Sequence, residues 1–588
     1  MFRLRRQVNC DHNATTPVSR PVRKAMIRAL TGLQANPSTP YREGREASWA
    51  AEEARRDLAA AVKADPGCLI FTSGATEANN HIRSIAPLLP EDRRFIIYNP
   101  MEHPAMLEPL KLLEKAGFGL LAAKPDRLGR IGLAELQRLW RAEAGLTVMM
   151  AANNETGTLY SIKEMAAWVR SRGGLFFSDM VQALGKIPVD LTDLGVDYAS
   201  FSAHKIYGPK GVGALYVRAG APFAPFMVGG GQENGRRAGT ESLHNLAGLA
   251  AAARQVPSLL AKTAGLRSLK EAFIQGLSEM CPEAVFNSPP GDQGQPGTVS
   301  LTLPGRDNSF LLGQLDFHGI RAAAGSACST GANEPSHVLL AAGLSPEDAR
   351  STLRLSFGHD FSKKDLAYLL KVFRIILKGD EGRDIAIIRP SEIDEDFLFQ
   401  KDLTIIRVKR YPRLPGPRSL PGSLVIPLND TKSWDSLNPR GPVFLTCDVG
   451  YDAPIIAWSL RRRGVSRLSV LALGLWGLRL SRPELWDRLA ERFPEYPENP
   501  ENPEPPAELK DPEPPAELKE PEQPAELKNP EPPAELKEPE QPAELKESEG
   551  LPELEKAAGS ADSAGPSLPE ETRTPGLPPD PGSPEAGS

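Results

Sequence analysis

Short apolar runs alternate with amphipathic stretches in the N-terminal part of the chain. The apolar runs have the length of β-strands, and an Ala-, Glu- and Arg-rich stretch that ends near Val62 has the composition of a helix. Strands that alternate with helices predict an α/β fold with a mainly parallel sheet covered on both faces. Such sheets bind ligands at the carboxyl ends of their strands, where polar residues follow several of these runs. The runs lie at residues 69–71, 95–98, 147–150, 174–178 and 198–201.

Lys205 follows the last of these runs and precedes another one at residues 214–217. The pattern predicts two strands joined through the lysine and a Gly-Pro-Lys-Gly turn. A lysine held in such a turn can lose its water shell, which lowers the pKa of its amine and lets the amine bond to an aldehyde. For an isolated lysine, an exposed position in a hairpin is the more common explanation.

Asp179 changes this interpretation, because it ends the apolar run at residues 174–178. An aspartate that faces a pyridine nitrogen and a lysine that faces an aldehyde are the two groups that a pyridoxal 5'-phosphate (PLP) enzyme needs. The segments 178–186 and 202–213, which contain Asp179 and Lys205, resemble the cysteine desulfurases of the NifS/IscS type. These are fold-type I PLP enzymes, and the resemblance extends from about Val8 to about Leu377.

The resemblance implies a domain organisation for this part of the chain. A cysteine desulfurase is expected over residues 1–377, with the large PLP domain at about 15–255. The smaller α+β domain is expected at about 256–377, together with the N-terminal residues. Two departures from the family pattern occur, since His12 replaces an asparagine in the opening motif and Ala238 replaces a serine.

A glycine turn at residues 72–76 opens a predicted helix after the first apolar run. Free backbone N–H groups at such a turn bind phosphate, although the same sequence alone is more often a plain helix cap. The resemblance implies that this turn holds the PLP phosphate. The cofactor-binding residues that it implies are Ala75, Thr76, His103, Asn154, Asp179, Gln182, Ser202, His204, Lys205 and Thr240.

Each of these residues has an implied role. His103 stacks on the pyridine ring and helps to move protons, while Asn154 and Gln182 hydrogen bond to the phenolic oxygen of PLP. Thr240 reaches the phosphate of a neighbouring subunit, which implies a homodimer with composite sites. Lys205 carries the cofactor and is the expected base.

Cys328 lies in a Gly-, Ala- and Ser-rich segment, a composition typical of a loop rather than a packed core. This segment is nearly identical to the long-loop version in the desulfurases, which implies that Cys328 is catalytic and carries a persulfide. Arg354 offers a planar fork for the carboxylate of the substrate, L-cysteine, and Asn154 is the second expected substrate-binding residue. Cys10, Cys68 and Cys281 are interpreted as small apolar residues.

A weaker resemblance follows a charged linker at residues 378–397. Residues 398–490 resemble a degenerate rhodanese-like domain, a small α/β unit that retains a cysteine, Cys447, before a helix. Three positions depart from that family: Arg407 replaces an aspartate, Ser419 a histidine and Asp452 an arginine. Cys447 is a candidate persulfide relay, but an inactive or specialised domain is the favoured interpretation, because Asp452 adds negative charge beside the thiol.

Residues 491–588 are rich in proline and glutamate and contain tandem nine-residue repeats at 502–546. Proline breaks helices and the few leucines cannot bury a core, so a disordered, dispensable tail is expected.

Composition limits the remaining choices. The chain has 588 residues, a net charge of −6 and five scattered cysteines without CxxC spacing. Nucleic-acid binding, a disulfide framework and a metal site are therefore not expected. No apolar run is long enough for a membrane span and the basic start lacks an apolar core, so a cytoplasmic protein is expected.

The predicted function is a PLP-dependent cysteine desulfurase that converts L-cysteine to L-alanine and passes sulfur to an acceptor protein, for iron–sulfur cluster assembly or thiolation. Two alternatives remain open. One is a selenocysteine lyase or another class-V aminotransferase-like reaction, and the other is a sulfur-delivery scaffold that acts through the rhodanese-like domain.

Overall fold

A computed structural model describes most of the chain up to Phe493. The described residues are 6–325, 335–378, 385–410, 417, 419–437, 439, 441–448, 450, 452–471 and 474–493. Cys328 and the repeats at 502–546 lie outside these residues, so the predictions about them stay predictions.

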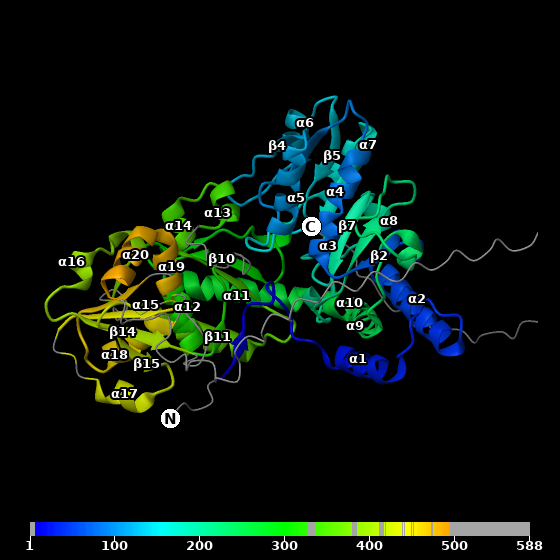
Figure 1. Cartoon of the computed structure of the whole chain (residues 1–588). Helices are drawn as coiled ribbons and strands as arrows, with labels where there is room; N and C mark the ends of the chain where they lie inside the picture. Colours follow the sequence, from blue (N-terminus) through cyan, green and yellow to red (C-terminus); the bar gives the residue numbers. More distant parts are fainter. Residues whose placement is uncertain are drawn as a thin grey trace, which may run out of the picture. The chain divides into compact units, whose positions relative to one another are not determined.

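A seven-stranded sheet forms the centre of the large domain (Figure 1). Every pairing is parallel except the two made by β8, which runs antiparallel to both of its neighbours. The prediction of a mainly parallel sheet is therefore confirmed. In spatial order the strands are β2 (Leu69–Thr72), β8 (Gly213–Val217), β7 (Tyr198–Ser202), β6 (Leu175–Asp179), β5 (Ala144–Val148), β3 (Phe95–Tyr98) and β4 (Gly119–Ala122).

Alternate side chains of these strands enter two different hydrophobic clusters, one on each face of the sheet. In β6, Phe176 packs into one cluster and Phe177 into the other. This alternation follows from the two-residue period of a strand and explains why the runs are apolar throughout. One cluster also contains residues of α2 (Arg42–Val62), α7 (Ile162–Ser171) and α9 (Leu243–Ala253). The other contains residues of α4 (Ile82–Ile85) and α5 (Pro104–Lys115).

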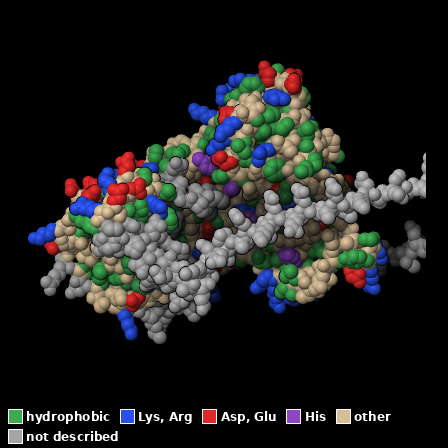
Figure 2. All heavy atoms as spheres, in the orientation of Figure 1, with side chains coloured by type: hydrophobic (Ala, Val, Ile, Leu, Met, Phe, Trp, Pro, Cys, Tyr) green, Lys and Arg blue, Asp and Glu red, His purple; other side chains and the backbone are tan. Residues whose placement is uncertain are grey.

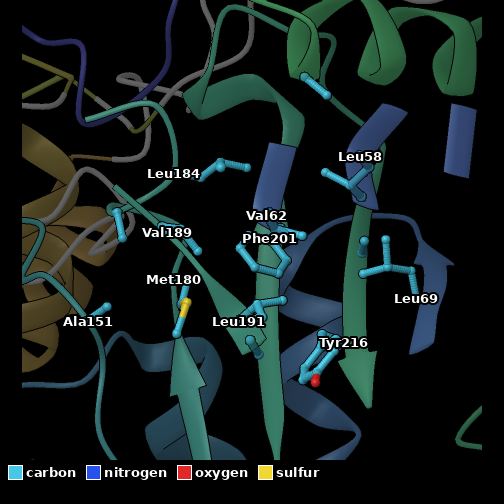
Figure 3. Packing of buried hydrophobic residues seen from close by; sticks show 14 of the residues in the cluster. Leu58, Val62, Leu69, Ala151, Met180, Leu184, Val189, Leu191, Phe201 and Tyr216 are labelled. Carbon is cyan, nitrogen blue, oxygen red and sulfur yellow. The ribbon is translucent and has the colours of Figure 1, made fainter. Parts of the chain in front are cut away.

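Figure 3 shows how one of these clusters is filled. Leu58 and Val62 come from α2, and Phe201 from β7 approaches them from the sheet. All three side chains are buried, with at most 1% of their surface exposed. The apolar side of α2 thus fixes this helix on the sheet.

The small domain is built on an antiparallel three-stranded sheet in the order β12 (Thr352–Ser356), β10 (Thr298–Thr302), β9 (Val285–Phe286). A separate two-stranded pair joins β1 (Val8–Asn9) to β11 (Ile320–Arg321) in parallel. Residues of α11 (Thr263–Met280), α12 (Asn308–Phe317) and α15 (Lys363–Lys378) share one hydrophobic cluster with these strands. Val8 and Cys10 pack in the same cluster, so the N-terminal residues lie with these strands.

A third sheet, in the C-terminal part, has five strands that all pair in parallel. Its order is β13 (Ile385–Ile388), β17 (Leu468–Leu471), β16 (Val443–Cys447), β14 (Thr404–Lys409), β15 (Leu424–Pro427). Helices α17 (Thr431–Ser436) and α18 (Asp452–Arg462) contribute to a cluster on one face. On the other face lie residues of α16 (Glu395–Leu398), α19 (Gly474–Ser481) and α20 (Pro483–Arg492).

Two predicted boundaries need correction here. Residues 378–397 were expected to be a linker, but β13 and α16 lie inside this range, so the C-terminal sheet begins before residue 398. Residues 491–588 were expected to be a disordered tail, but α20 continues to Arg492. A four-residue strand beside charged residues gives too short a pattern to be separated from a linker by sequence alone.

Charged side chains of both signs are interspersed over the coloured surface in Figure 2. Within the part of the chain that the structure describes, no helix combines the length and the apolar character that a bilayer crossing requires.

Candidate active site

Asp179 is the last residue of β6 and only 5% of its surface is exposed. Its Oδ2 accepts a hydrogen bond of 2.7 Å from the side-chain nitrogen of Asn79, and its Oδ1 accepts one of 2.9 Å from the backbone N–H of Val181. Both oxygens of this buried carboxylate are therefore held in position. The aspartate is therefore suited to face a protonated ring nitrogen.

Lys205 ends a short 3₁₀ turn, Ala203–Lys205, directly after β7. Strands β7 and β8 pair antiparallel from Tyr198 opposite Val217 to Ser202 opposite Gly213, which confirms the predicted pair of strands. The amine of Lys205 donates to the backbone oxygens of Asn13 at 2.6 Å and Ala14 at 2.8 Å. Because β6 and β7 are neighbours, Asp179 and Lys205 come from the same edge of the sheet.

Asn13 joins several parts of this site. Its backbone oxygen accepts from Lys205 and, at 3.0 Å, from the side-chain nitrogen of Gln182. Its side-chain oxygen accepts a 2.7 Å bond from Lys186, and its side-chain nitrogen donates to the backbone oxygen of Asn154 at 3.1 Å. Asn13 therefore positions the lysine turn relative to the residues that follow β5 and β6.

Lys186 was not among the residues predicted from the sequence. It donates to the side-chain oxygens of both Asn13 and Gln182, so it fixes the orientation of two amides. Burial lowers the pKa of Lys186 well below its usual range, and the charges of Lys205 and Arg354 lower it further. The amide of Gln182 thus has protein partners at both ends.

His103 caps the N-terminus of α5, where its Nδ1 accepts a 3.1 Å hydrogen bond from the backbone N–H of Ala105. This bond leaves Nε2 as the nitrogen that can carry a proton. Burial lowers the pKa of His103, the charge of Asp179 raises it, and that of Lys205 lowers it. A neutral imidazole beside the lysine and the aspartate fits the predicted role in stacking and proton movement.

The predicted phosphate turn lies between β2 and α3 (Ala75–Asn80). Glu77 holds it by accepting a 2.8 Å bond from the backbone N–H of Ser73, and Arg237 donates to the same carboxylate at 2.8 Å. Gly213 lies against the turn, since a Cβ added there would sit 2.8 Å from the backbone of Gly74. Ser202, the residue paired with Gly213, is thereby brought beside the turn.

Thr240 lies three residues beyond Arg237, on an exposed part of the chain. Ala238, which replaces the family's serine, is buried with 8% of its surface exposed. The ion pair between Arg237 and Glu77 therefore ties the segment of Thr240 to the phosphate turn, while Thr240 itself faces outward.

Arg354 is on β12 of the small domain, and its side chain is 3% exposed. It donates to Asp11 at 2.8 Å and to the backbone oxygen of Asn154 at 3.3 Å. Among the described residues, none hydrogen bonds to the buried side-chain oxygen of Asn154 or to Nε of Arg354. Buried polar groups normally have a hydrogen-bond partner, so these two groups indicate a bound ligand as the missing partner.

The arrangement fits PLP in three respects. Asp179 offers a charged carboxylate for the ring nitrogen, Lys205 offers an amine at the neighbouring strand end, and the turn before α3 lies next to Ser202. The side-chain oxygen of Asn154 has no hydrogen-bond partner among the described residues and can accept a bond from a polar ligand group. The residues predicted to bind the substrate and those predicted to bind the cofactor thus come together from the two domains.

His204 is predicted to make the protein less stable in acid. Burial, together with the charges of Lys205, Lys210 and Lys186, lowers its pKa from 6.5 to about 4. Between these values the unfolded chain binds a proton that the folded protein does not, so stability falls as the pH falls from about 6.5 to about 4, by roughly 3 kcal/mol in total. Urea unfolding of the cofactor-free protein at pH 7 and pH 4.5 measures this loss.

The His204→Gln variant should lose distinctly less stability over the same pH interval. Some loss will remain, because burial also lowers the pKa values of His81, His103 and His359. Equal losses in the variant and in the wild type would contradict the prediction.

The described cysteines are all unpaired thiols. Burial raises the pKa of Cys10 strongly and that of Cys281 to about 11, as expected for unreactive thiols. Burial also raises the pKa of Cys68. None of these three cysteines has the low pKa that marks a reactive thiol.

Comparisons with known proteins agree with this site. Residues 8–369 match the family described as Aminotransferase class-V. The chain is 37% identical over 377 residues to the cysteine desulfurase IscS of Dictyoglomus turgidum, covering 64% of this chain and 95% of that protein. A solved structure called NifS-like protein has a TM-score of 0.59 and 34% identity, covering 63% of this chain and 99% of the other. Another, called SspA in complex with cysteine, has a TM-score of 0.53 and 31% identity, covering 60% and 99% of the two chains.

The fold and the lysine–aspartate pair define a PLP-dependent enzyme of fold type I. Within this class, the chain belongs to the cysteine desulfurases of the class-V aminotransferase family.

Proposed function

We propose that the protein is a PLP-dependent cysteine desulfurase that converts L-cysteine to L-alanine and leaves the sulfur as a persulfide on Cys328. The observation that carries this proposal is the convergence of Lys205, Asp179 and Arg354. The first two come from neighbouring strand ends of the large domain, and Arg354 reaches Asn154 from the small domain. The match of residues 8–369 to the class-V aminotransferase family and the likeness to a cysteine desulfurase over 377 residues support the same reaction.

PLP, when bound, supplies an electron sink that makes the bonds at the substrate's Cα and Cβ easier to break. The protein supplies the binding groups. Asp179 keeps a ring nitrogen protonated through its charged carboxylate, and Ser202, His204 and the turn at Ala75 and Thr76 are suited to the phosphate. Asn154, with Gln182 beside it, supplies an amide for the phenolic oxygen.

Arg354 orients the substrate. Its guanidinium is fixed by Asp11 and by the backbone of Asn154, so a substrate carboxylate meets a fork that is already in position. A preorganised arginine loses little conformational freedom when it binds a carboxylate.

Lys205 is the group that would take the proton from Cα, because its amine stands at the end of β7, next to the strand that carries Asp179. His103 assists at Nε2, the nitrogen that is left available by the cap of α5. Both groups act in a partly buried site, where electrostatic interactions are stronger than in water.

Cys328 takes the sulfur. In the overall step the Cys328 thiol and L-cysteine give a Cys328 persulfide and L-alanine, so the substrate C–S bond breaks and an S–S bond forms. Of the two thiol protons, one stays on the persulfide and the other ends on the methyl group of alanine. The electron pair of the broken C–S bond stays with that carbon, so no external oxidant is required. An acceptor protein then removes the sulfur, for iron–sulfur cluster assembly or thiolation.

One assay separates this reaction from its alternatives. The purified protein should show a visible PLP band and release alanine from L-cysteine. A selenocysteine lyase would release alanine from selenocysteine only, and a pure sulfur-delivery scaffold would release none from either amino acid. Either of those results would replace the proposed function.

A homodimer is part of the proposal. Thr240 is exposed, although the adjoining Arg237 is tied to the phosphate turn, which is consistent with a role in the site of a second subunit. Large apolar side chains are also exposed on α1 (Arg20–Gly32) and α2, namely Ile27, Leu30 and Trp49. Sedimentation of the purified protein tests this assembly.

The C-terminal domain is proposed to be rhodanese-like. Its sheet is parallel throughout, and Cys447 ends the central strand β16 just before α18. The backbone N–H of Gly450 lies 3.1 Å from the sulfur of Cys447. A strand that ends at a cysteine and is followed by a helix supports the weaker resemblance.

The residues that depart from the rhodanese pattern form hydrogen bonds or ion pairs, either with one another or with charged residues nearby. Arg407, which is 1% exposed, forms an ion pair of 2.7 Å with Asp448 and donates to Ser419 at 2.9 Å. Asp452 forms an ion pair of 2.5 Å with Arg410. These pairs support a specialised domain rather than a general sulfurtransferase, because they engage the charged groups around the thiol.

Cys447 is expected to receive little sulfur. It is completely buried, and burial raises the pKa of its thiol, with the charge of Asp452 raising it further. Labelled L-cysteine in a single turnover, followed by alkylation and peptide mapping, measures where the sulfur resides. We expect label on Cys328 and unchanged delivery by Cys447→Ser. Label on Cys447 that disappears in Cys328→Ser would instead establish a relay, for which the short tether between the domains would provide a high effective concentration.

A further inference from the structure

The segment before α1 makes several hydrogen bonds to the turn that carries Lys205. Thr16 lies in this segment, and only 6% of its surface is exposed. Its backbone N–H and its hydroxyl both donate to the backbone oxygen of His204, at 3.0 Å and 2.9 Å. The same hydroxyl oxygen accepts a 2.7 Å hydrogen bond from the backbone N–H of Tyr207. Thr16 is therefore bonded to the chain on both sides of Lys205.

We propose that Thr16 is a positioning residue for Lys205, because its hydroxyl joins the two backbone groups that flank this lysine. Thr16 acts through the backbone of the turn rather than through the amine of Lys205. The inference rests on the proposed role of Lys205 as the cofactor lysine. It adds the group that fixes the backbone from which the lysine side chain extends.

The hydrogen bonds inside the turn leave a place for this hydroxyl. The N–H groups of Ile206 and Gly208 both donate to the backbone oxygen of Ala203, at 3.0 Å and 2.9 Å. The N–H of Tyr207, which lies between them, donates to Thr16 instead. Backbone N–H groups of folded proteins almost always have a partner, and an unpaired one costs free energy. Without the hydroxyl of Thr16, the turn would lose the acceptor for this N–H.

Tyr207 also has an unusual backbone conformation, with a φ angle of 64°. A left-handed conformation is uncommon for a bulky residue and persists only where its surroundings stabilise it. Besides the bond to Thr16, the backbone oxygen of Tyr207 accepts a 3.0 Å bond from the N–H of Ser19. Its hydroxyl accepts a 2.8 Å bond from the backbone N–H of His359. The conformation of the turn two residues after Lys205 thus depends on contacts with distant segments, and Thr16 supplies the one at its N–H.

Thr302 provides a matched control for the loss of a buried threonine hydroxyl. It lies in β10 of the small domain, and only 1% of its surface is exposed. Its hydroxyl accepts a 2.9 Å bond from the side-chain nitrogen of Asn287 and shares a 2.7 Å bond with the hydroxyl of Thr352. Thr302→Val therefore removes two hydrogen bonds of a buried hydroxyl, as Thr16→Val does, but none to the lysine turn.

The first measurement is hydrogen exchange of the full-length proteins without PLP, followed on peptides that cover residues 203–209. In Thr16→Val we expect exchange in these peptides to be about tenfold faster, the ratio that the loss of one hydrogen bond produces. Thr16→Ser keeps the hydroxyl and should exchange as the wild type does. Thr302→Val should leave these peptides unchanged.

The second measurement concerns PLP. After PLP is added to Thr16→Val, the visible band should form about tenfold more slowly, because the lysine is less well positioned. In the loaded enzyme, kcat for alanine formation should fall by a similar factor. The KM for L-cysteine should stay the same, because Arg354 is not altered. Thr16→Ser should restore both rates, and Thr302→Val should change neither.

Unchanged exchange in Thr16→Val, or equal effects of Thr16→Val and Thr302→Val on the turn, would overturn the proposal. If Thr16→Val does not fold, the wild type decides, because its Tyr207 amide should exchange far more slowly than an exposed amide. Exchange at the exposed rate would overturn the proposal. If the wild type formed no alanine at all, the proposed function would fail, while the exchange rates would still decide whether Thr16 holds the turn.

Discussion

Replacing Lys205 by alanine is expected to abolish alanine formation from L-cysteine, with a loss of roughly a thousandfold or more. The variant should also lose the absorbance band that borohydride reduction fixes onto the protein. The physical reason is that the amine of Lys205 stands at the strand end beside Asp179, held by the backbone oxygens of Asn13 and Ala14. Steady-state rates, absorbance spectra and peptide mapping of the reduced wild type measure these effects.

Lys210→Ala is the control, because Lys210 lies in the turn after Lys205 and is exposed. It should retain the spectrum and most of the activity. A pyridoxyl group found on Lys186 or on another lysine of the reduced wild type would show that the cofactor lysine has been assigned wrongly.

Replacing Cys328 by serine is expected to separate cofactor binding from sulfur transfer. Cys328→Ser should bind PLP with an unchanged spectrum, because no residue of the cofactor site is altered. It should release almost no sulfide from L-cysteine under reducing conditions, since serine cannot form a persulfide. Cofactor absorbance and sulfide release in parallel samples are the measurements.

Cys281→Ser serves as the control for this variant, because burial raises the pKa of Cys281 to about 11 and makes it unreactive at neutral pH. It should behave as the wild type does. Substantial sulfide release by Cys328→Ser would point to Cys447 or to a thiol in solution as the acceptor.

Much of the large domain could be predicted from the pattern of apolar runs. The run ending at Asp179 and the run before Lys205 became the neighbouring strands β6 and β7, so the two residues meet because of the sheet order alone. The antiparallel pairing of β8 with β7 also followed from the short connection through Lys205, whereas the pairing of β8 with β2 did not. These features are local, and local patterns are what a sequence displays most clearly.

The supporting residues of the site could not be predicted in this way. Asn79 donates to Asp179 from α3, and Lys186 reaches Asn13 across a gap of 173 positions in the sequence. Such contacts depend on the packing of distant segments, and a lysine or an asparagine in a loop gives no signal of its partner. The sequence indicated these supporting residues only through their position next to the recognised motifs. Many polar residues in such positions only form turns.

The hydrogen bonds of residues 11–16 have a consequence for the order in which the protein can be made. Asn13 and Asp11 are each synthesised 343 residues before their respective partners Ser356 and Arg354. During translation, domains generally fold as units from the N-terminus. Here the seven-stranded sheet can form early, whereas the opening residues must wait for strand β12 to leave the ribosome. A nascent chain that stops before residue 352 can therefore form the lysine turn. It lacks the hydrogen bonds of Asn13 and Asp11 to strand β12.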